Sequence, residues 1–368
     1  MFSLGPQYYL HLYTLLVIIL SVFLFVPYAH YPQSRLDDDK KASSKLVFLL
    51  AVLLIAFIGL RPVSGKYFVD MANYYAHYLV YQGDPFHFNW KTENVLFDNL
   101  FCFLASKNVP AEYFFVSMAA IYFGCMAWAC GGLFPQDKLT AFVVYLGAFS
   151  TYSYSTNGIK AGAAASLFLV ALALYEHRRW LWMVVFLLLS WGFHHSMALP
   201  VAAFCVCLFV KNPRWYFLLW ALCFIIAALH ITYFQELFAN IIDEKGSMYL
   251  SGDDGYVRRD ILGGFRIDFI LYSAVPIIVG WIAVYKRFIR SERFIFLLNL
   301  YILTNSIWLL CMYADFTNRI AYLSWLLFPI VLIYPFLKER WGSSQFKTFC
   351  WVALGHLGFT LFMNYIYT

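Results

Sequence analysis

Long apolar stretches separated by short polar breaks run along this whole chain. Each stretch holds about 15 to 20 residues, close to the ~20 that a helix needs to cross the ~30 Å hydrocarbon core of a bilayer. Stretches such as 46–60 are apolar on both faces, which favours helices over the alternating strands of a membrane barrel. Backbone groups in lipid must be paired within the segment, which also requires helices. The pattern therefore predicts an all-α, polytopic transmembrane protein.

About 12 spans are expected. The stretch 94–106 is only 13 residues long and carries Asp98, so we expect a re-entrant or interfacial segment there. The stretch 181–210 is expected to be a hairpin with its tip at 192–196. The first span is expected to be retained, because residues 1–11 lack the basic start of a cleaved signal peptide. The predicted spans are 8–28, 46–60, 113–132, 139–155, 161–176, 181–193, 196–210, 215–232, 268–285, 294–313, 320–337 and 348–366.

Composition supports one integral membrane domain over residues 1–368. Apolar residues make up 62% and charged residues 12%, and no stretch is polar enough for a second, soluble domain. The net charge of +6 comes from small basic groups beside the spans, which is a topology signal rather than a surface for nucleic acid. Of the 26 Lys and Arg, 16 lie in the breaks on one side, so we assign that side to the cytoplasm.

The eight cysteines predict neither a disulfide framework nor a metal site. Most lie within apolar runs and none forms a CxxC pair, so we expect them to pack as small apolar residues.

Four cations are expected at the outer ends of spans, on the side where positive charge is scarce: Arg61, Lys160, Arg266 and Arg319. Ionisable groups at the membrane are costly and often functional. Guanidinium groups bind phosphate oxygens through two N–H groups and keep their charge. Lys160 is expected in the first turn of a small-residue helix, where its ammonium opposes the helix dipole but adds to an anion site. These cations therefore predict a polyanionic ligand such as a lipid diphosphate.

Each of these residues also has a structural alternative. Arg61 and Lys160 could each extend to the interface without binding anything. Asp268 could pair with Arg266, and Asp315 with Arg319 at i,i+4 spacing.

Acid–base candidates are expected on the same side. His194 and His195 lie at the predicted hairpin tip, and an imidazole accepts a proton near neutral pH, as a general base for a hydroxyl requires. Asp70 begins a predicted interfacial helix that also carries Tyr74, although an aspartate there can simply cap the helix. The catalytic candidates are His195, Asp70 and His194.

Two outer loops, 61–112 and 233–267, are expected to cap the site. Their polar side chains suit a polyhydroxylated ligand, although a solvated loop would look similar. The acceptor or sugar-binding candidates are Tyr74, Asp253, Asp254, Tyr256, Asp268 and Asp315.

At these residues the chain resembles the EpsG-type membrane proteins of bacterial exopolysaccharide synthesis, which are related to Wzy O-antigen polymerases. The resemblance covers residues 55–335. The family pattern resembles FHxS with one histidine, which favours His195 over His194. Lys160 stands where the family often has arginine. The positive charge is kept, but lysine lacks the fork with which arginine binds two oxygens. The matching stretches, in the same order, are GLRPVSGKYFVDMANYY, NGIKAGAAASLFLVALALYEHRRW followed by FHHSMALP, GGFRIDFILYSAVP, and TNRIAYLSWLLFP.

The resemblance implies a GT-C-like helical fold and an inverting glycosyltransferase that needs no metal or other cofactor. It places the protein in the bacterial cytoplasmic (inner) membrane with the active site facing the periplasm. The implied partners are donor and acceptor oligosaccharides linked to undecaprenyl diphosphate, the lipid bilayer and a chain-length regulator, with no nucleic acid.

Two other functions fit parts of the pattern. A transporter or flippase of a lipid-linked or anionic solute would need charges near the bilayer midplane in broken helices, whereas these charges are expected at one leaflet. A membrane acyltransferase acting on sugars would also use an intramembrane histidine, but its site would open to cytoplasmic acyl-CoA.

Overall fold

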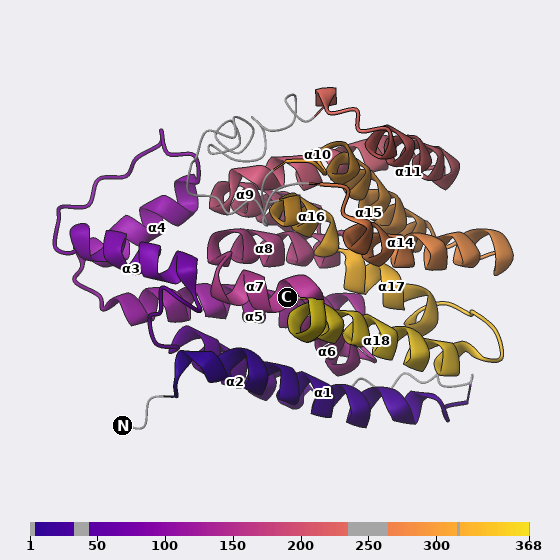
Figure 1. Ribbon diagram of the computed structural model, residues 1–368, viewed down its shortest axis with the longest axis horizontal. Coiled ribbons are helices and arrows are strands. Elements are labelled where there is room, and N and C mark those ends of the chain that lie inside the picture. The colour runs from indigo at the N-terminus through magenta and orange to yellow at the C-terminus, as the bar shows by residue number, and fades with distance from the viewer. Residues whose placement is uncertain (1–3, 33–43, 235–263, 315–316, 368) are drawn as a thin grey trace. The chain divides into compact units, whose positions relative to one another are not determined.

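The structure, a computed structural model, describes residues 4–32, 44–234, 264–314 and 317–367 (Figure 1). Within these ranges the chain forms helices and no strand, which confirms the all-α prediction. The chain folds into two compact units, residues 1–194 with 346–368, and residues 195–345. The boundary falls between His194 and His195.

Unit 1 contains ten α-helices within its described residues. Its helices α5, α8 and α9 pack side by side, and α2 packs on α5. The small residues of α8, such as Ala163 and Ala164, are fully buried and allow this close approach. The helices are α1 (Tyr9–Tyr28), α2 (Ser44–Gly59), α3 (Val69–Val80), α4 (Val95–Ser106), α5 (Ala111–Leu133), α6 (Lys138–Leu146), α7 (Phe149–Thr156), α8 (Ile159–Glu176), α9 (Trp180–Phe193) and α18 (Gln345–Phe362), the last beginning one residue before the boundary.

Unit 2 is built around α15, which packs on α10, α11, α14, α16 and α17. Polar side chains inside it pair with one another. The Trp220 indole N–H donates to Asn305 Oδ1 at 2.8 Å, and the Asn305 amide donates to the Ser324 hydroxyl at 3.0 Å. Such pairing offsets the cost of burying polar groups. The helices are α10 (Ala198–Phe209), α11 (Pro213–Ala228), α14 (Ile267–Trp281), α15 (Glu292–Leu310), α16 (Thr317–Trp325) and α17 (Phe328–Leu337).

Seven helical segments of the described ranges are long and apolar enough to cross a membrane, so the protein is a multi-pass membrane protein. Five further apolar helices, α2, α4, α9, α10 and α11, are shorter. The segment 94–106, which we expect not to span the membrane, forms α4, one of these shorter helices. The count of 12 spans and the GT-C-like arrangement stay predictions. The seven are Pro6–Tyr28, Ala111–Leu133, Ile159–Glu176, Ile267–Lys286, Glu292–Leu310, Thr317–Leu337 and Gln345–Ile366.

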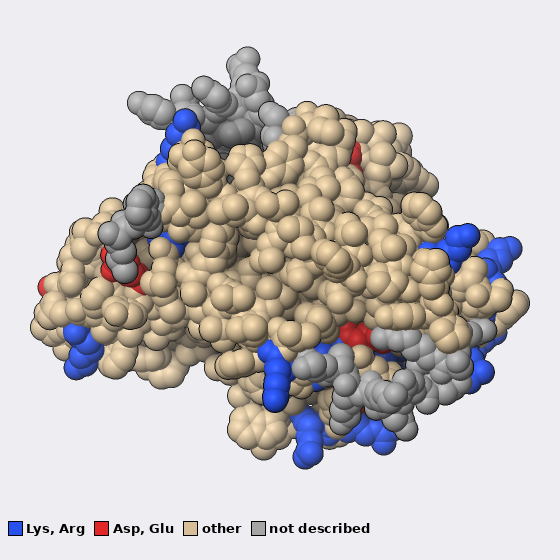
Figure 2. All heavy atoms as spheres, turned by 90° about the horizontal axis from the view of Figure 1, so that it is seen from below, with Lys and Arg blue, Asp and Glu red and all other residues tan. Residues whose placement is uncertain are grey.

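Uncharged side chains cover most of the face shown in Figure 2, and Lys and Arg side chains gather toward its edges. Uncharged surface of this extent suits contact with lipid.

The predicted span 139–155 is not one helix but two, because the chain breaks at Gly147 between α6 and α7. Side chains from elsewhere in unit 1 pair the backbone oxygens that the break releases. The Tyr13 hydroxyl donates to the carbonyl oxygen of Leu146 at 2.7 Å, and the Thr360 hydroxyl to that of Gly147 at 2.7 Å. Broken helices are tolerated at membrane depth when neighbouring side chains satisfy the backbone in this way.

Candidate functional site

Arg61 follows the end of α2 and is buried, with only 2% of its surface exposed. Its Nη1 donates to the carbonyl oxygen of Ile58 at 2.6 Å, and its Nη2 to that of Thr156 at 2.5 Å. The guanidinium also lies against the rings of Phe68 and Phe115, 5.3 and 5.6 Å from their centroids. Arg61 therefore does not extend to the interface, and the ends of its fork are engaged by backbone oxygens.

Arg61 keeps its charge in this setting. Burial lowers the pKa of its guanidinium to about 10, while the nearby Tyr152 and Tyr9 act in the opposite direction. A group with this pKa is cationic at neutral pH. Its Nε atom is buried without a hydrogen-bond partner.

The break between α7 and α8 lies directly beside Arg61. The main chain turns at Asn157 and Gly158, and α8 starts at Ile159, as predicted. The close approach of α8 to α7 requires glycine at position 162, because a Cβ there would lie 2.5 Å from the carbonyl oxygen of Tyr154. The Oδ1 atom of Asn157 is buried without a hydrogen-bond partner. A buried acceptor of this kind is unusual and suits a donor from a ligand.

Lys160 occupies the first turn of α8, which confirms the sequence prediction. It is half-buried, and its Nζ lies 5.7 Å from the centre of the Phe97 ring of α4. The Tyr74 ring of α3 packs edge-on against Phe97, with centroids 5.6 Å apart. Phe97 thus links the cation of α8 to a predicted sugar-binding residue of α3.

Asp70 and His194 lie at helix ends of the same unit. Asp70 is half-buried in the first turn of α3, whose N-cap residue Phe68 makes no side-chain cap. His194 is the C-cap of α9 in an extended conformation, with φ −151° and ψ 119°. Because α9 packs on α4, the end of α9 belongs to the same group of helices. The helix ends at this histidine, as predicted.

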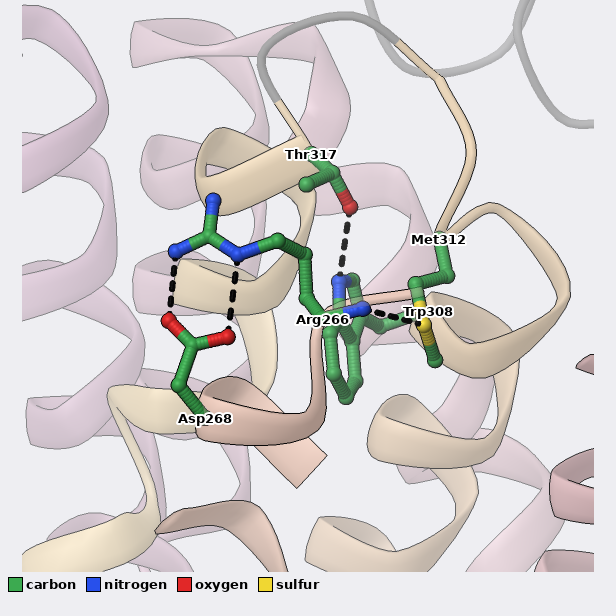
Figure 3. Close-up of polar contacts among 5 residues, drawn as sticks. All are labelled: Arg266, Asp268, Trp308, Met312 and Thr317. Carbon is green, nitrogen blue, oxygen red and sulfur yellow. Dashed lines mark hydrogen bonds and ion pairs between the residues drawn. The ribbon is translucent and has the colours of Figure 1, made fainter. Parts of the chain in front are cut away.

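In unit 2, His195 begins a short 3-10 turn, His195–Met197, and is half-buried. Arg266 and Asp268 form a bidentate ion pair, as the structural alternative predicted (Figure 3). The Arg266 Nε and Nη2 atoms donate to the two carboxylate oxygens at 3.0 and 2.6 Å. The guanidinium also stacks on Phe269, 3.7 Å from the ring centroid. One edge of the Arg266 fork is therefore already taken by a carboxylate.

Of the remaining predicted residues, the structure describes only Arg319. Arg319 is exposed on α16. The same helix begins at Thr317, whose hydroxyl accepts from the Trp308 indole at 3.0 Å (Figure 3). Asp315, Asp253, Asp254 and Tyr256 lie outside the described residues, so the Asp315–Arg319 pair stays a prediction.

Three contributors in unit 1 were not predicted from the sequence: Thr156 as the partner of Arg61, Phe97 as the neighbour of Lys160, and Asn157 as a buried acceptor. The stretch STNGIK, which holds Thr156 and Asn157, carries a visible signal in its helix-breaking Asn-Gly pair.

Within the part of the chain that the structure describes, no three His, Cys, Asp or Glu residues are grouped to hold a metal ion.

Comparison with known proteins identifies the family. No curated protein and no solved structure matches the chain. The model of the EpsG family matches residues 44–367, which include α2 to α18 and each predicted site residue. The chain belongs to the EpsG family.

Proposed function

We propose that this protein is a polysaccharide polymerase that joins oligosaccharides carried on undecaprenyl diphosphate at the outer face of the bacterial cytoplasmic membrane. EpsG family membership implies a glycosyltransferase-like polymerase activity in polysaccharide synthesis. One observation supports the location of the site. Lys160 in the first turn of α8, the buried Arg61 cation and the unpartnered Asn157 oxygen all lie at the same helix break.

This arrangement suits the departure of a diphosphate. In the proposed reaction, a hydroxyl at the non-reducing end of the acceptor attacks the anomeric carbon of the donor chain. The bond from that carbon to the diphosphate oxygen breaks, and the hydroxyl proton passes to a base. Attack from the face opposite the leaving group inverts the anomeric configuration. A fixed cation beside helix N–H groups stabilises charge that develops on the leaving oxygen.

Lys160 is the proposed contact to the diphosphate, and His195 or Asp70 the proposed base. Tyr74 is proposed to bind the sugar. Arg266 and Arg319 are proposed to bind phosphate, which for Arg266 requires a shift of the Asp268 carboxylate.

The decisive experiment reconstitutes the purified protein in nanodiscs with a synthetic oligosaccharide linked to undecaprenyl diphosphate. We expect a ladder of longer lipid-linked glycans. One undecaprenyl diphosphate should be released for each new glycosidic linkage. Nuclear magnetic resonance of the new linkage should show the inverted anomer. Turnover only with acyl-CoA, or movement of intact substrate across proteoliposomes without new linkages, would reject it in favour of an acyltransferase or a flippase.

The proposed orientation has its own test. Single cysteines at 107, 137, 178 and 289 are labelled in intact cells with a membrane-impermeant maleimide. We expect labelling at 107 alone, and labelling at 178 and 289 would invert the topology.

A further inference from the structure

A groove of about 470 Å³ runs between α1 and α18 within unit 1. Leu15 and Ile18 line it from α1, and Leu361 and Phe362 line it from α18. Gly358 forms part of its wall, and a Cβ there would meet nothing within 4 Å, so the space in front of the glycine is open. The groove is therefore an apolar trough between two candidate spans.

The two helices meet at both ends of this trough. At one end the His11 Nδ1 atom lies 3.3 Å from the Tyr365 hydroxyl, and the two rings stack with centroids 5.5 Å apart. Toward the other end the ring of Phe349 packs against Phe25 and Tyr28, with centroids 5.8 and 4.8 Å away. Between these contacts the groove follows α1 from His11 to Ile18, about two helical turns, which suits a segment of a chain-shaped ligand.

The two helices that form the trough are largely exposed, as helices in contact with lipid are. Of the seven candidate spans, α1 and α18 have the smallest buried shares, 28% and 39%. A hydrocarbon chain could therefore enter sideways from the bilayer without crossing water. In Figure 1, α1 and α18 run alongside each other.

The polar end of the trough leads to Arg61. Tyr152 of α7 is near enough to interact electrostatically with both Tyr365 and Arg61. The Tyr152 ring also lies 5.1 Å from that of Tyr13 on α1. Tyr152 thus neighbours both the polar end of the trough and Arg61, whose cation lies on the side where a lipid headgroup would lie.

We infer that the trough between α1 and α18 binds the isoprenoid chain of a lipid diphosphate-linked substrate, with the diphosphate directed past Tyr365 toward Arg61 and Lys160. This inference rests on the proposed function and adds the binding site for the lipid part of the substrate. The apolar walls exclude the sugar, so the chain lies in the trough and the glycan at the helix break. The family match begins at residue 44, so one wall of the trough comes from a helix outside the matched range.

Photo-crosslinking tests where the lipid binds. A benzophenone amino acid replaces Leu361 in the full-length protein, and radiolabelled undecaprenyl diphosphate is added to nanodiscs of phosphatidylethanolamine and phosphatidylglycerol. The matched control carries the same probe at Phe23 of α1, which is 75% exposed and is not among the residues that line the trough. We expect at least fivefold more label at 361 than at 23, and competition by unlabelled undecaprenyl diphosphate but not by phosphatidic acid. Equal labelling, or equal competition by both lipids, would overturn the inference.

Filling the trough provides a second test. Gly358→Leu places a side chain in the open space, whereas Gly355→Leu adds the same side chain at a glycine of α18 that also has no neighbour within 4 Å and does not line the trough. We expect Gly358→Leu to reduce label at 361 at least fivefold, and Gly355→Leu to leave it unchanged, with similar melting temperatures. Unchanged label in Gly358→Leu would contradict the inference.

Both tests measure binding and not turnover. Specific labelling without polymer formation would reject the proposed reaction but not the lipid site in the trough. Polymer formation with non-specific labelling would reject the lipid site in the trough but not the proposed reaction.

Discussion

The Nη2 atom of Arg61 lies 2.5 Å from the carbonyl oxygen of Thr156, so a residue that follows α2 holds the last turn of α7. The last carbonyl groups of a helix lack partners within the helix and must find them elsewhere. Arg61 supplies one, and its second amino group ties the same guanidinium to Ile58 of α2. The break from which α8 starts is therefore fixed by a buried cation.

Replacing Arg61 should lower stability and activity together. Arg61→Ala removes two charge-assisted hydrogen bonds and leaves the carbonyl oxygen of Thr156 without this partner, at a cost of about 2 to 4 kcal/mol. Arg61→Lys keeps the charge but cannot reach both oxygens with a planar fork, so we expect it to lose most of the same stability. Thermal unfolding in detergent and polymer length on gels measure the two effects. A normal melting temperature with no polymer would instead make Arg61 a direct phosphate ligand.

Lys160 should behave differently, because its side chain is half-buried and lies beside the Phe97 ring rather than holding a helix end. We expect Lys160→Ala to reduce turnover about 100-fold, as loss of one transition-state donor commonly does, with an unchanged melting temperature. Lys160→Arg should restore most of the turnover, because it returns the positive charge. The control is Lys107→Ala, which removes an exposed lysine that lies near Phe103. Equal turnover in Lys160→Ala and Lys107→Ala would remove Lys160 from the site.

The sequence predicts features that depend on neighbouring residues. The start of α8 just before Lys160, the helix end at His194 and the pairing of Arg266 with Asp268 all follow from short-range spacing. The burial of Arg61 does not, because its partner Thr156 is 95 positions away. The break at Gly147 depends on Thr360 in the same way, at a separation of 213 positions. A hydrophobic pattern carries no information on such pairs.

The Arg266–Asp268 pair can be tested by removing each partner. The pair is partly exposed, so Asp268→Asn should cost about 1 kcal/mol or less. If Arg266 binds phosphate, Asp268→Asn frees its fork and should keep or raise substrate affinity, whereas Arg266→Ala should weaken it at least tenfold. Equilibrium binding of the lipid-linked substrate measures both. Equal loss of binding in the two variants would show that the intact ion pair, and not the free guanidinium, is required.

The base can be identified by comparing three variants. We expect His195→Ala to reduce turnover at neutral pH by about 100-fold or more, as loss of a general base does. His194→Ala should retain most of the turnover, because the family pattern favours the second histidine. Asp70→Asn is nearly isosteric and should isolate the role of the carboxylate. Turnover in His195→Ala together with its loss in Asp70→Asn would assign the base to Asp70.

Asn157 offers a test of ligand binding that is separate from folding. Its Oδ1 atom is buried without a partner, so Asn157→Ala breaks no hydrogen bond at that atom. Removing an unpaired buried acceptor should leave the free energy of unfolding within about 1 kcal/mol of the parent value. If the oxygen accepts a hydrogen bond from the glycan, the same change should raise KM at least fivefold.

The contrast with Thr156 makes this test specific. Thr156→Ala keeps the backbone oxygen that Arg61 binds and removes only a hydroxyl that donates to the Tyr152 carbonyl oxygen at 2.8 Å within α7. We expect Thr156→Ala to change KM less than twofold. A KM that is unchanged in Asn157→Ala, or raised equally in both variants, would remove the Asn157 oxygen from glycan binding and leave Lys160 as the contact at this helix break.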